Sequence, residues 1–189
     1  TLWRIYSARA ILTAGAIERP IAFENNDRPG IMLAGALRAY ANRWGVAAGD
    51  RVAVFTNNDD GLRTARDLQA KGVDVAAVID SREGGDLLPG LRHLQGAQVV
   101  DSSGGLGLKS VTVRLANGKT ETIACTALGV SGGWNPNVNI TSHHRSRPEW
   151  RDDIAAFVPG TGGPAGLTAA GAANGALSTH GALATGQAQ

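Results

Sequence analysis

Apolar and polar positions divide the middle of the chain into a strand, a helix and a second strand. Residues 51–56 alternate in the manner of a strand, residues 61–71 follow as a helix that Gly72 ends, and residues 73–79 form the next strand. This order is a β-α-β unit, the first half of a Rossmann-type fold. The predicted fold class is therefore α/β, Rossmann-like, with a parallel sheet.

A β-hairpin interrupts this pattern. Residues 111–115 and 120–124 alternate around Asn117-Gly118, which is the strongest short-range hairpin signal. We expect a further strand edge at residues 99–100. The hairpin that follows the β-α-β unit resembles the three-stranded flap that many flavoprotein-type domains add. Residues 128–130 read as one more buried strand, and residues 141–153 are polar and irregular.

The two ends of the chain carry short apolar strands followed by small residues. Residues 1–12 predict two short strands, and residues 13–16 contain only small side chains. Residues 33–44 predict a helix. Near the end, we expect a strand at 166–170, a tight turn at 171–175 and a helix at 176–185.

Composition narrows the range of function classes. The 189 residues carry a net charge of only +2, without a Lys/Arg block, so no nucleic-acid partner is expected. No apolar run reaches the roughly 18 residues of a membrane helix, and Cys125 is the only cysteine, so we expect a cytoplasmic protein with no membrane contact. The chain opens inside an expected strand at Thr1 rather than Met, which suggests that its beginning is missing.

The turn after the first middle strand, residues 56–61, is the place where a Rossmann unit binds pyrophosphate. It holds one glycine and two acids, Asp59 and Asp60, where the dinucleotide fingerprint needs glycines. Two carboxylates there would repel a pyrophosphate, so we expect no dinucleotide in this unit and assign Asp59 or Asp60 as the helix N-cap. Asp80 is interpreted as a strand-end turn residue rather than a ribose-binding acid.

Other candidate groups point to structure rather than chemistry. His143-His144 is expected in a surface loop with no metal, and Cys125 in the core. Trp44, Trp134 and Trp150 are expected in the core or in an interface. No catalytic residue can be assigned.

Three segments, at residues 12–36, 130–136 and 170–175, together resemble one family. They read LTAGAIERPIAFENNDRPGIMLAGA, VSGGWNP and AGAANG, and the series is similar to the alpha subunit of heterotetrameric sarcosine oxidase. Related amine and opine dehydrogenases and hydrogen cyanide synthase carry similar blocks. The resemblance implies a flavoprotein-type architecture with two dinucleotide-binding domains.

The resemblance also implies a domain map and a set of cofactors. Residues 1–45 would be part of the first dinucleotide-binding domain, residues 46–127 an inserted second Rossmann-like domain, and residues 128–189 the return to the first. The first domain would hold NAD in the intact subunit, while FAD and FMN would belong to the whole complex. The partners would be the other subunits of a hetero-oligomeric oxidase and the missing parts of the same chain.

The residues that would contact the cofactor lie in the turn after the first strand and in the final strand–turn–helix. They are Thr13, Ala14, Gly15, Ala16, Gly171, Ala172, Leu177 and Thr179. Two departures from the flavoprotein pattern stand out: Thr-Ala-Gly replaces Ala-Thr-Gly at the first turn, and Ala172 replaces the acid of the usual Gly-Asp. The missing acid argues against a typical FAD contact. We expect little binding by this piece alone, because the main pyrophosphate loop would lie upstream.

The implied activity is that of an oxidoreductase acting on CH–NH groups. As part of its complex it would demethylate sarcosine oxidatively to glycine and formaldehyde, with oxygen as acceptor, and this piece alone would be inactive. The alternatives are a subunit of a related amine, opine or N-methylglutamate dehydrogenase, and a non-catalytic scaffold with a vestigial nucleotide site.

Overall fold

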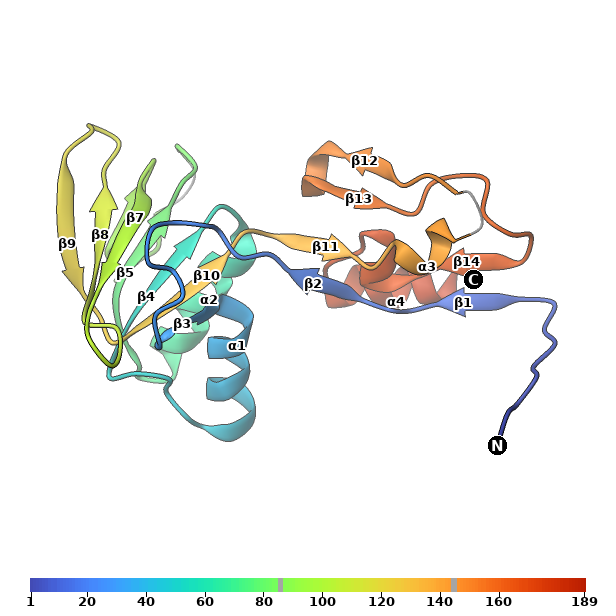
Figure 1. Ribbon diagram of the computed structural model, residues 1–189, viewed down its shortest axis with the longest axis horizontal. Helices are drawn as coiled ribbons and strands as arrows, with labels where there is room; N and C mark the ends of the chain where they lie inside the picture. Colours follow the sequence, from blue (N-terminus) through green and yellow to red (C-terminus); the bar gives the residue numbers. More distant parts are fainter. Residues whose placement is uncertain (85–86, 144–145) are drawn as a thin grey trace. The chain divides into compact units, whose positions relative to one another are not determined.

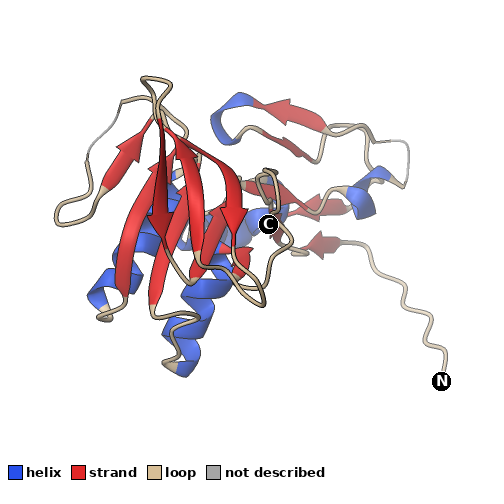
Figure 2. Cartoon of the chain, turned by 60° about the vertical axis from the view of Figure 1, so that its left-hand side comes forward, coloured by secondary structure: helices blue, strands red, loops and turns tan. Residues whose placement is uncertain are grey.

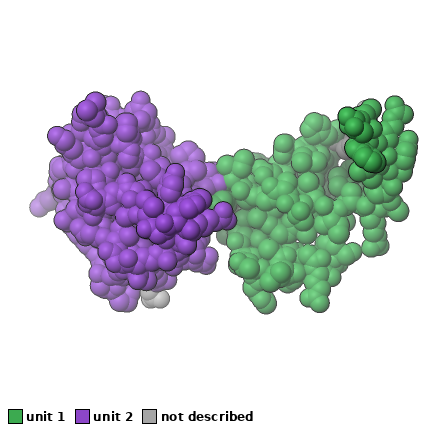
Figure 3. All heavy atoms as spheres, turned by 90° about the horizontal axis from the view of Figure 1, so that it is seen from below, with its two compact units in different colours: residues 1–17, 134–189 green, residues 18–133 purple. Residues whose placement is uncertain are grey.

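The computed structural model describes residues 1–84, 87–143 and 146–189. The chain divides into two compact units: unit 1 is residues 1–17 with 134–189, and unit 2 is residues 18–133 (Figure 3). The predicted domain boundaries, after residues 45 and 127, differ from these divisions and stay a prediction about a larger architecture.

Unit 2 contains a parallel sheet, a small antiparallel sheet and two helical segments (Figure 1). Its elements are β3 (Ile31–Leu33), α1 (Ala34–Ala39), η1 (Tyr40–Trp44), β4 (Arg51–Thr56), α2 (Asp59–Ala70), β5 (Asp74–Asp80), β6 (His93–Gln95), β7 (Gln98–Ser103), β8 (Ser110–Arg114), β9 (Thr120–Ala124) and β10 (Ala127–Ser131).

Five parallel strands form the central sheet of unit 2 in the order β3-β10-β4-β5-β6. The predicted β-α-β unit is β4-α2-β5, and the predicted flap is the antiparallel sheet β7-β8-β9. Helices α1 and α2 cover one face of the parallel sheet and the flap covers the other. In Figure 2 the helices are blue and the strands of both sheets are red. Both faces of the sheet are thus buried, as parallel sheets require.

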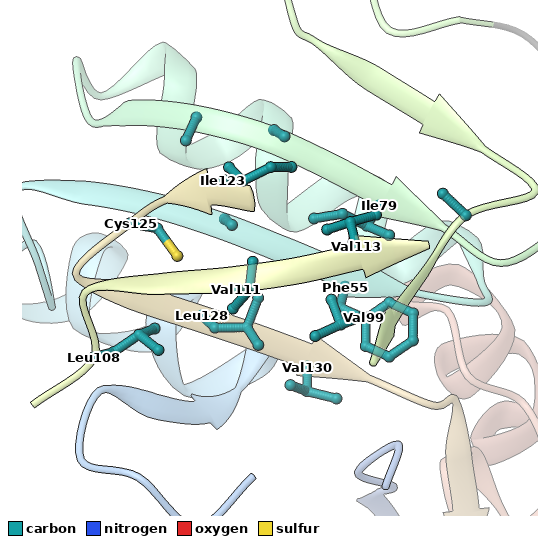
Figure 4. Close-up of a cluster of buried hydrophobic side chains, with 14 residues drawn as sticks. Phe55, Ile79, Val99, Leu108, Val111, Val113, Ile123, Cys125, Leu128 and Val130 are labelled. Carbon is teal, nitrogen blue, oxygen red and sulfur yellow. The ribbon is translucent and has the colours of Figure 1, made fainter. Parts of the chain in front are cut away.

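Successive side chains of β4 point to opposite faces of the sheet, so this strand contributes to both hydrophobic cores. Ala53 and Phe55 pack toward the flap, whereas Val52 and Val54 pack toward α1 and α2. Figure 4 shows the flap-side core, where Val111 of β8 meets side chains of the parallel sheet. Cys125 belongs to this core, which confirms its structural interpretation, and burial raises the pKa of its thiol to about 11.

Close packing of α2 on β4 depends on one glycine. A Cβ placed on Gly61 would lie 2.2 Å from Oγ1 of Thr56. Gly61 therefore serves the approach of helix to strand, which is one of the roles that glycines have in Rossmann turns.

Unit 1 consists of short strands and small helical turns. Its elements are β1 (Ala10–Leu12), β2 (Ala16–Glu18), β11 (Trp134–Pro136), α3 (Asn139–Ser142), β12 (Glu149–Arg151), η2 (Asp152–Ile154), β13 (Ala156–Val158), β14 (Leu167–Ala169), η3 (Gly171–Asn174) and α4 (Thr179–Gln187), of which Glu18 at the end of β2 falls in unit 2. The pairs are β1 with β14, β2 with β11, and β12 with β13.

Several sequence predictions need correction at the ends of the chain. The first of the two strands expected within residues 1–12 is absent, since residues 1–9 form no strand and only β1 is seen there. Residues 141–153 are not irregular where described, because β12 pairs with β13 through Trp150 and Phe157. The predicted helix at 33–44 is real, but its last five residues form the π-helix η1.

Candidate functional site

The expected cofactor-contacting turns leave the same edge of a two-stranded parallel sheet. In the β1–β14 pair, Leu12 lies opposite Ala169, and the backbone N–H of Ala170 donates to the carbonyl of Leu12 at 3.0 Å. Parallel strands end at a common carboxyl edge, which is where α/β sheets bind their ligands. Thr13 and Gly171 therefore begin their turns beside each other, although they are 158 positions apart in the chain.

The first turn, residues 13–16, depends on a left-handed glycine. Gly15 has φ +74°, and no atom lies within 4 Å of the Cβ that a larger residue would carry. The left-handed backbone conformation is what favours glycine at this position, because a larger side chain would have room. Thr13 and Ala14 are exposed, so a ligand could reach them from solvent.

Asn137 holds this turn in place, and sequence reasoning missed it. Its Nδ2 donates to the carbonyl of Ala14 at 2.7 Å, and its backbone N–H donates to the carbonyl of Gly15 at 3.0 Å. Asn137 directly follows the segment 130–136 that carries the resemblance, which is the signal that could have indicated it.

The last turn is tighter and better bonded. Gly171 has φ +66°, and its N–H donates to Oγ1 of Thr185 at 2.9 Å. Gly175 is required for close packing, because its Cβ would lie 2.8 Å from Cγ1 of Val158. Residues 171–174 form the short helix η3, where the sequence predicted a simple turn.

The final helix begins later than predicted. Ser178 is the N-cap of α4 and accepts from the N–H of Gly181 at 3.0 Å, so the helix starts at Thr179 rather than at Ala176. Thr179 is thus a first-turn residue, as expected. Leu177, expected inside the helix, precedes it.

The chemistry of the two turns suits a nucleotide in part. All eight expected contact residues are uncharged, and five of them are glycine or alanine. With no carboxylate among them to repel an anion, exposed backbone and the Thr13 and Thr179 hydroxyls could approach a ribose or phosphate. None of these eight side chains is a base at neutral pH, so they offer binding rather than catalysis.

A hollow of about 460 Å³ lies near these turns and has a different lining. It is bordered by Thr168 and Ala169 of β14, by Asn174, and by the glycine-rich stretch 160–163. Ser146 lines it and donates from its hydroxyl to the carbonyl of Gly160 at 3.1 Å. None of the eight expected residues lines this hollow, so the cofactor assignment depends on the turns alone.

The equivalent turn of unit 2 is closed by a side chain. Oδ1 of Asn58 accepts from the N–H groups of Asp60 and Gly61, at 3.0 and 3.3 Å. Asn58 is therefore the N-cap of α2, and the assignment of Asp59 or Asp60 was wrong, because the helix begins earlier than expected, at Asp59. The N–H groups that a pyrophosphate would use are already bonded.

The two acids of that turn are paired rather than free. Asp59 contacts Nη1 of Arg82 at 2.8 Å, and Asp60 contacts Arg38 at 3.5 Å and Arg63 at 3.4 Å. The charge repulsion inferred from the sequence is thus partly neutralised. The bonded Asn58 is the stronger obstacle to a dinucleotide.

The remaining candidates have structural positions. Asp80 ends β5 and accepts from the N–H of Arg82, as a strand-end residue should. His143 is exposed, as predicted, whereas His144 lies outside the described residues. Trp44 and Trp150 are largely exposed rather than in a core. Among the described residues, no helix is long and apolar enough to cross a membrane.

Comparison with known sequences gives a consistent match. No protein-family model matches the chain. The sarcosine oxidase subunit alpha of Rhizobium meliloti (strain 1021) is 43% identical over 185 residues, which cover 97% of this chain and 18% of that protein. The sarcosine oxidase subunit alpha of Corynebacterium sp. (strain U-96) is 40% identical over 200 residues, covering 99% of this chain and 20% of that protein.

Solved structures agree on the fold. An L-proline dehydrogenase from P. horikoshii superposes with a TM-score of 0.63 at 24% identity, over 87% of this chain and 30% of that one. A thioredoxin reductase from T. acidophilum superposes with a TM-score of 0.65 at 14% identity, over 91% of this chain and 60% of that one. The predicted α/β, Rossmann-like class with a parallel sheet and an added antiparallel flap is confirmed.

The sequence matches cover almost all of this chain but only a small part of each relative. The chain spans about a fifth of the length of the curated relatives it matches, and the match extends over nearly every residue of the chain. Over that length, the chain matches a segment of sarcosine oxidase subunit alpha.

Proposed function

We propose that this chain is the part of a sarcosine oxidase alpha subunit that contributes to NAD binding and to subunit scaffolding. The observation that carries the proposal is the parallel pairing of β1 with β14, which brings residues 13–16 and residues 171–172 to one edge. The turns there are small and uncharged, as a closely approaching nucleotide requires. The proposal includes the cytoplasmic location expected from the sequence.

In this proposal the chemistry takes place elsewhere in the complex. Sarcosine, oxygen and water would give glycine, formaldehyde and hydrogen peroxide, with FAD and FMN carrying the electrons. This chain's part would be to hold one edge of NAD against the first turn and the start of α4, and to support the other subunits.

The experiment is a thermal-shift titration with NAD, using the intact subunit and an Ala172→Asp variant. The added carboxylate would repel the phosphates of a nucleotide that approaches this turn, so the NAD-dependent shift should fall by more than half. Ala116→Asp is the matched control, because Ala116 is an exposed residue in the β8–β9 turn of unit 2. Its shift should equal that of the unchanged protein.

Two results would count against the proposal. No shift at millimolar NAD with the intact subunit would remove NAD binding and leave the scaffold alternative. An unchanged shift in Ala172→Asp would show that NAD binds somewhere other than these turns.

The scaffold alternative has one specific observation in its favour. Oδ1 of Asn58 accepts from two N–H groups at the start of α2, so these groups are not free to bind a pyrophosphate. The fold does not determine the amine substrate, so a subunit of a related amine, opine or N-methylglutamate dehydrogenase would share it. Turnover of the complex with sarcosine against those amines distinguishes these possibilities.

A further inference from the structure

Unit 2 contains a polar cavity of about 620 Å³ at the carboxyl ends of its strands. Asp80 at the end of β5 and Gln95 at the end of β6 border it on the sheet side. The first two turns of α2 border it on the helix side, through Asp59, Arg63 and Arg66. Open α/β sheets bind their ligands in this position, and nothing in the proposed NAD function uses the cavity.

A buried histidine lines the cavity without a hydrogen-bond partner. The side chain of His93 is 1% exposed, and within the described part of the chain neither of its ring nitrogens is hydrogen-bonded. Its Nε2 lies 3.8 Å from Oδ2 of Asp80, beyond hydrogen-bond distance. A buried imidazole left unbonded is costly, and a ligand hydroxyl could bond it as donor or acceptor.

Asp80 is not available to His93, because Arg82 already occupies it. Nη2 and Nε of Arg82 donate to the two carboxylate oxygens of Asp80, at distances from 2.8 to 3.3 Å. Nη1 of Arg82 donates to Asp59 at 2.8 Å. The single positive charge of Arg82 offsets one of the two negative charges and joins the end of β5 to the start of α2.

Two arginines of α2 supply the remaining positive charge. Arg63 and Arg66 are three positions apart, so they lie on the same side of the helix. Arg63 makes one long contact with Asp60, at 3.4 Å, and Arg66 has no ion-pair or hydrogen-bond partner among the described residues. Glu83 is the third acid of the lining, and its oxygens could accept from hydroxyl groups.

These groups match a ligand with one phosphate and several hydroxyls. A phosphate would contact Arg63 and Arg66 by charge-assisted hydrogen bonds, and hydroxyls would contact His93 and Glu83. A diphosphate is disfavoured, because Asn58 keeps the N–H groups at the start of α2 bonded. We propose that this cavity binds a sugar phosphate, at a site separate from the NAD turns of unit 1.

Isothermal titration calorimetry of the full chain tests the proposal with ribose 5-phosphate. Arg66→Ala should weaken binding roughly tenfold, since a hydrogen bond to a charged group is lost. His93→Leu keeps a side chain of similar bulk without the nitrogens, and should also weaken binding. Arg43→Ala is the matched control, because Arg43 is exposed in η1 and does not line the cavity.

A series of three ligands separates the contribution of the phosphate group to binding from that of the sugar hydroxyls. Ribose without phosphate should bind at least about tenfold more weakly than ribose 5-phosphate, and inorganic phosphate should compete with it. Circular dichroism confirms that each variant is folded, and if His93→Leu does not fold, Arg66→Ala still decides the outcome.

Absence of binding by ribose 5-phosphate at millimolar concentration would overturn the proposal. Equal affinity in Arg66→Ala, or an equal loss in Arg43→Ala, would do so too. Because the NAD turns lie in unit 1, the NAD titration reports on them independently, and either proposal can fail without the other.

Discussion

The two units differ sharply in how they bury apolar side chains. Both hydrophobic cores lie in unit 2, where a parallel sheet is covered on both faces. In the described part of unit 1, the buried apolar side chains are those of Pro136, Ala156, Val158, Ala170 and Ala173. Its helix α4 has no buried residue, and Leu183 in that helix is 70% exposed.

This contrast shows that the better-packed unit is not the one that carries the expected cofactor turns. A two-stranded parallel sheet such as β1–β14 rarely stands uncovered, because parallel strands are normally buried on both faces. Unit 2 buries two hydrophobic clusters made of its own residues. The geometry of the expected NAD turns depends more on local bonds, above all those of Asn137 and Thr185.

The largest expected effect tests this contrast directly. Leu128→Ala removes a fully buried side chain from the centre of unit 2 and should lower the free energy of unfolding by about 3 kcal/mol. Leu183→Ala, the same change on an exposed helix of unit 1, should lower it by less than about 0.5 kcal/mol. Urea denaturation followed by circular dichroism measures both. Similar losses in the two variants would mean that α4 is packed after all.

A smaller effect tests the helix cap of unit 2. Asn58→Ala removes the side chain that bonds two N–H groups of α2 and should destabilise the protein by about 1 kcal/mol. Asp59→Ala, at the neighbouring and highly exposed position, should cost less than about 0.5 kcal/mol. Thermal denaturation measures the pair, and a larger loss in Asp59→Ala would favour Asp59 as the N-cap.

The smallest effect concerns a buried carboxyl group of unit 2. Burial raises the pKa of Glu18 above its ordinary value of 4.5; nearby Asp60 adds to the rise, while hydrogen bonds from Ser131 and Gly35 oppose it. Above pH 4.5 the unfolded chain releases this proton before the folded protein does. The stabilisation is therefore complete below pH 4.5 and is lost as pH rises through the folded value.

Glu18→Gln should flatten this decline by less than about 1 kcal/mol. Urea denaturation from about pH 4 to about pH 7 covers the range in which the group titrates. The control is Asp153→Asn in unit 1, where the Arg151 hydrogen bond lowers the pKa of a carboxyl group at the surface. That variant should leave the slope above pH 4.5 unchanged, and an unaltered slope in Glu18→Gln would contradict the assigned burial effect.

Local sequence patterns predicted the elements that have clear alternation of apolar and polar residues or clear turn residues at their ends. The strand at 51–56 was predicted with the bounds that it has, and the Asn117-Gly118 hairpin and the helix of the β-α-β unit were also found. These signals are strong because side-chain periodicity is set by the backbone itself. The small-residue turns at 13–16 and 171–175 are likewise apparent in the sequence alone.

Other features could not be predicted because they depend on partners far along the chain. Asn58 and Asp59 are both good N-caps by type, and only the fold chose between them. The strand at 149–151 forms by pairing with 156–158, and its polar residues give no strand pattern in the sequence. Asn137 carries no local signal of its contact with Ala14, 123 positions earlier.

The sequence by itself therefore determined the Rossmann-like class, the family resemblance and the two uncharged turns, since these lie in short stretches of residues. Only the tertiary structure decided that the turns meet at one edge, that Asn58 closes the other turn, and that His93 is buried beside Asp80 without a hydrogen-bond partner among the described residues. The reason is physical: periodicity and turn chemistry act within a few residues, whereas burial and hydrogen-bond satisfaction are properties of neighbours brought together by folding.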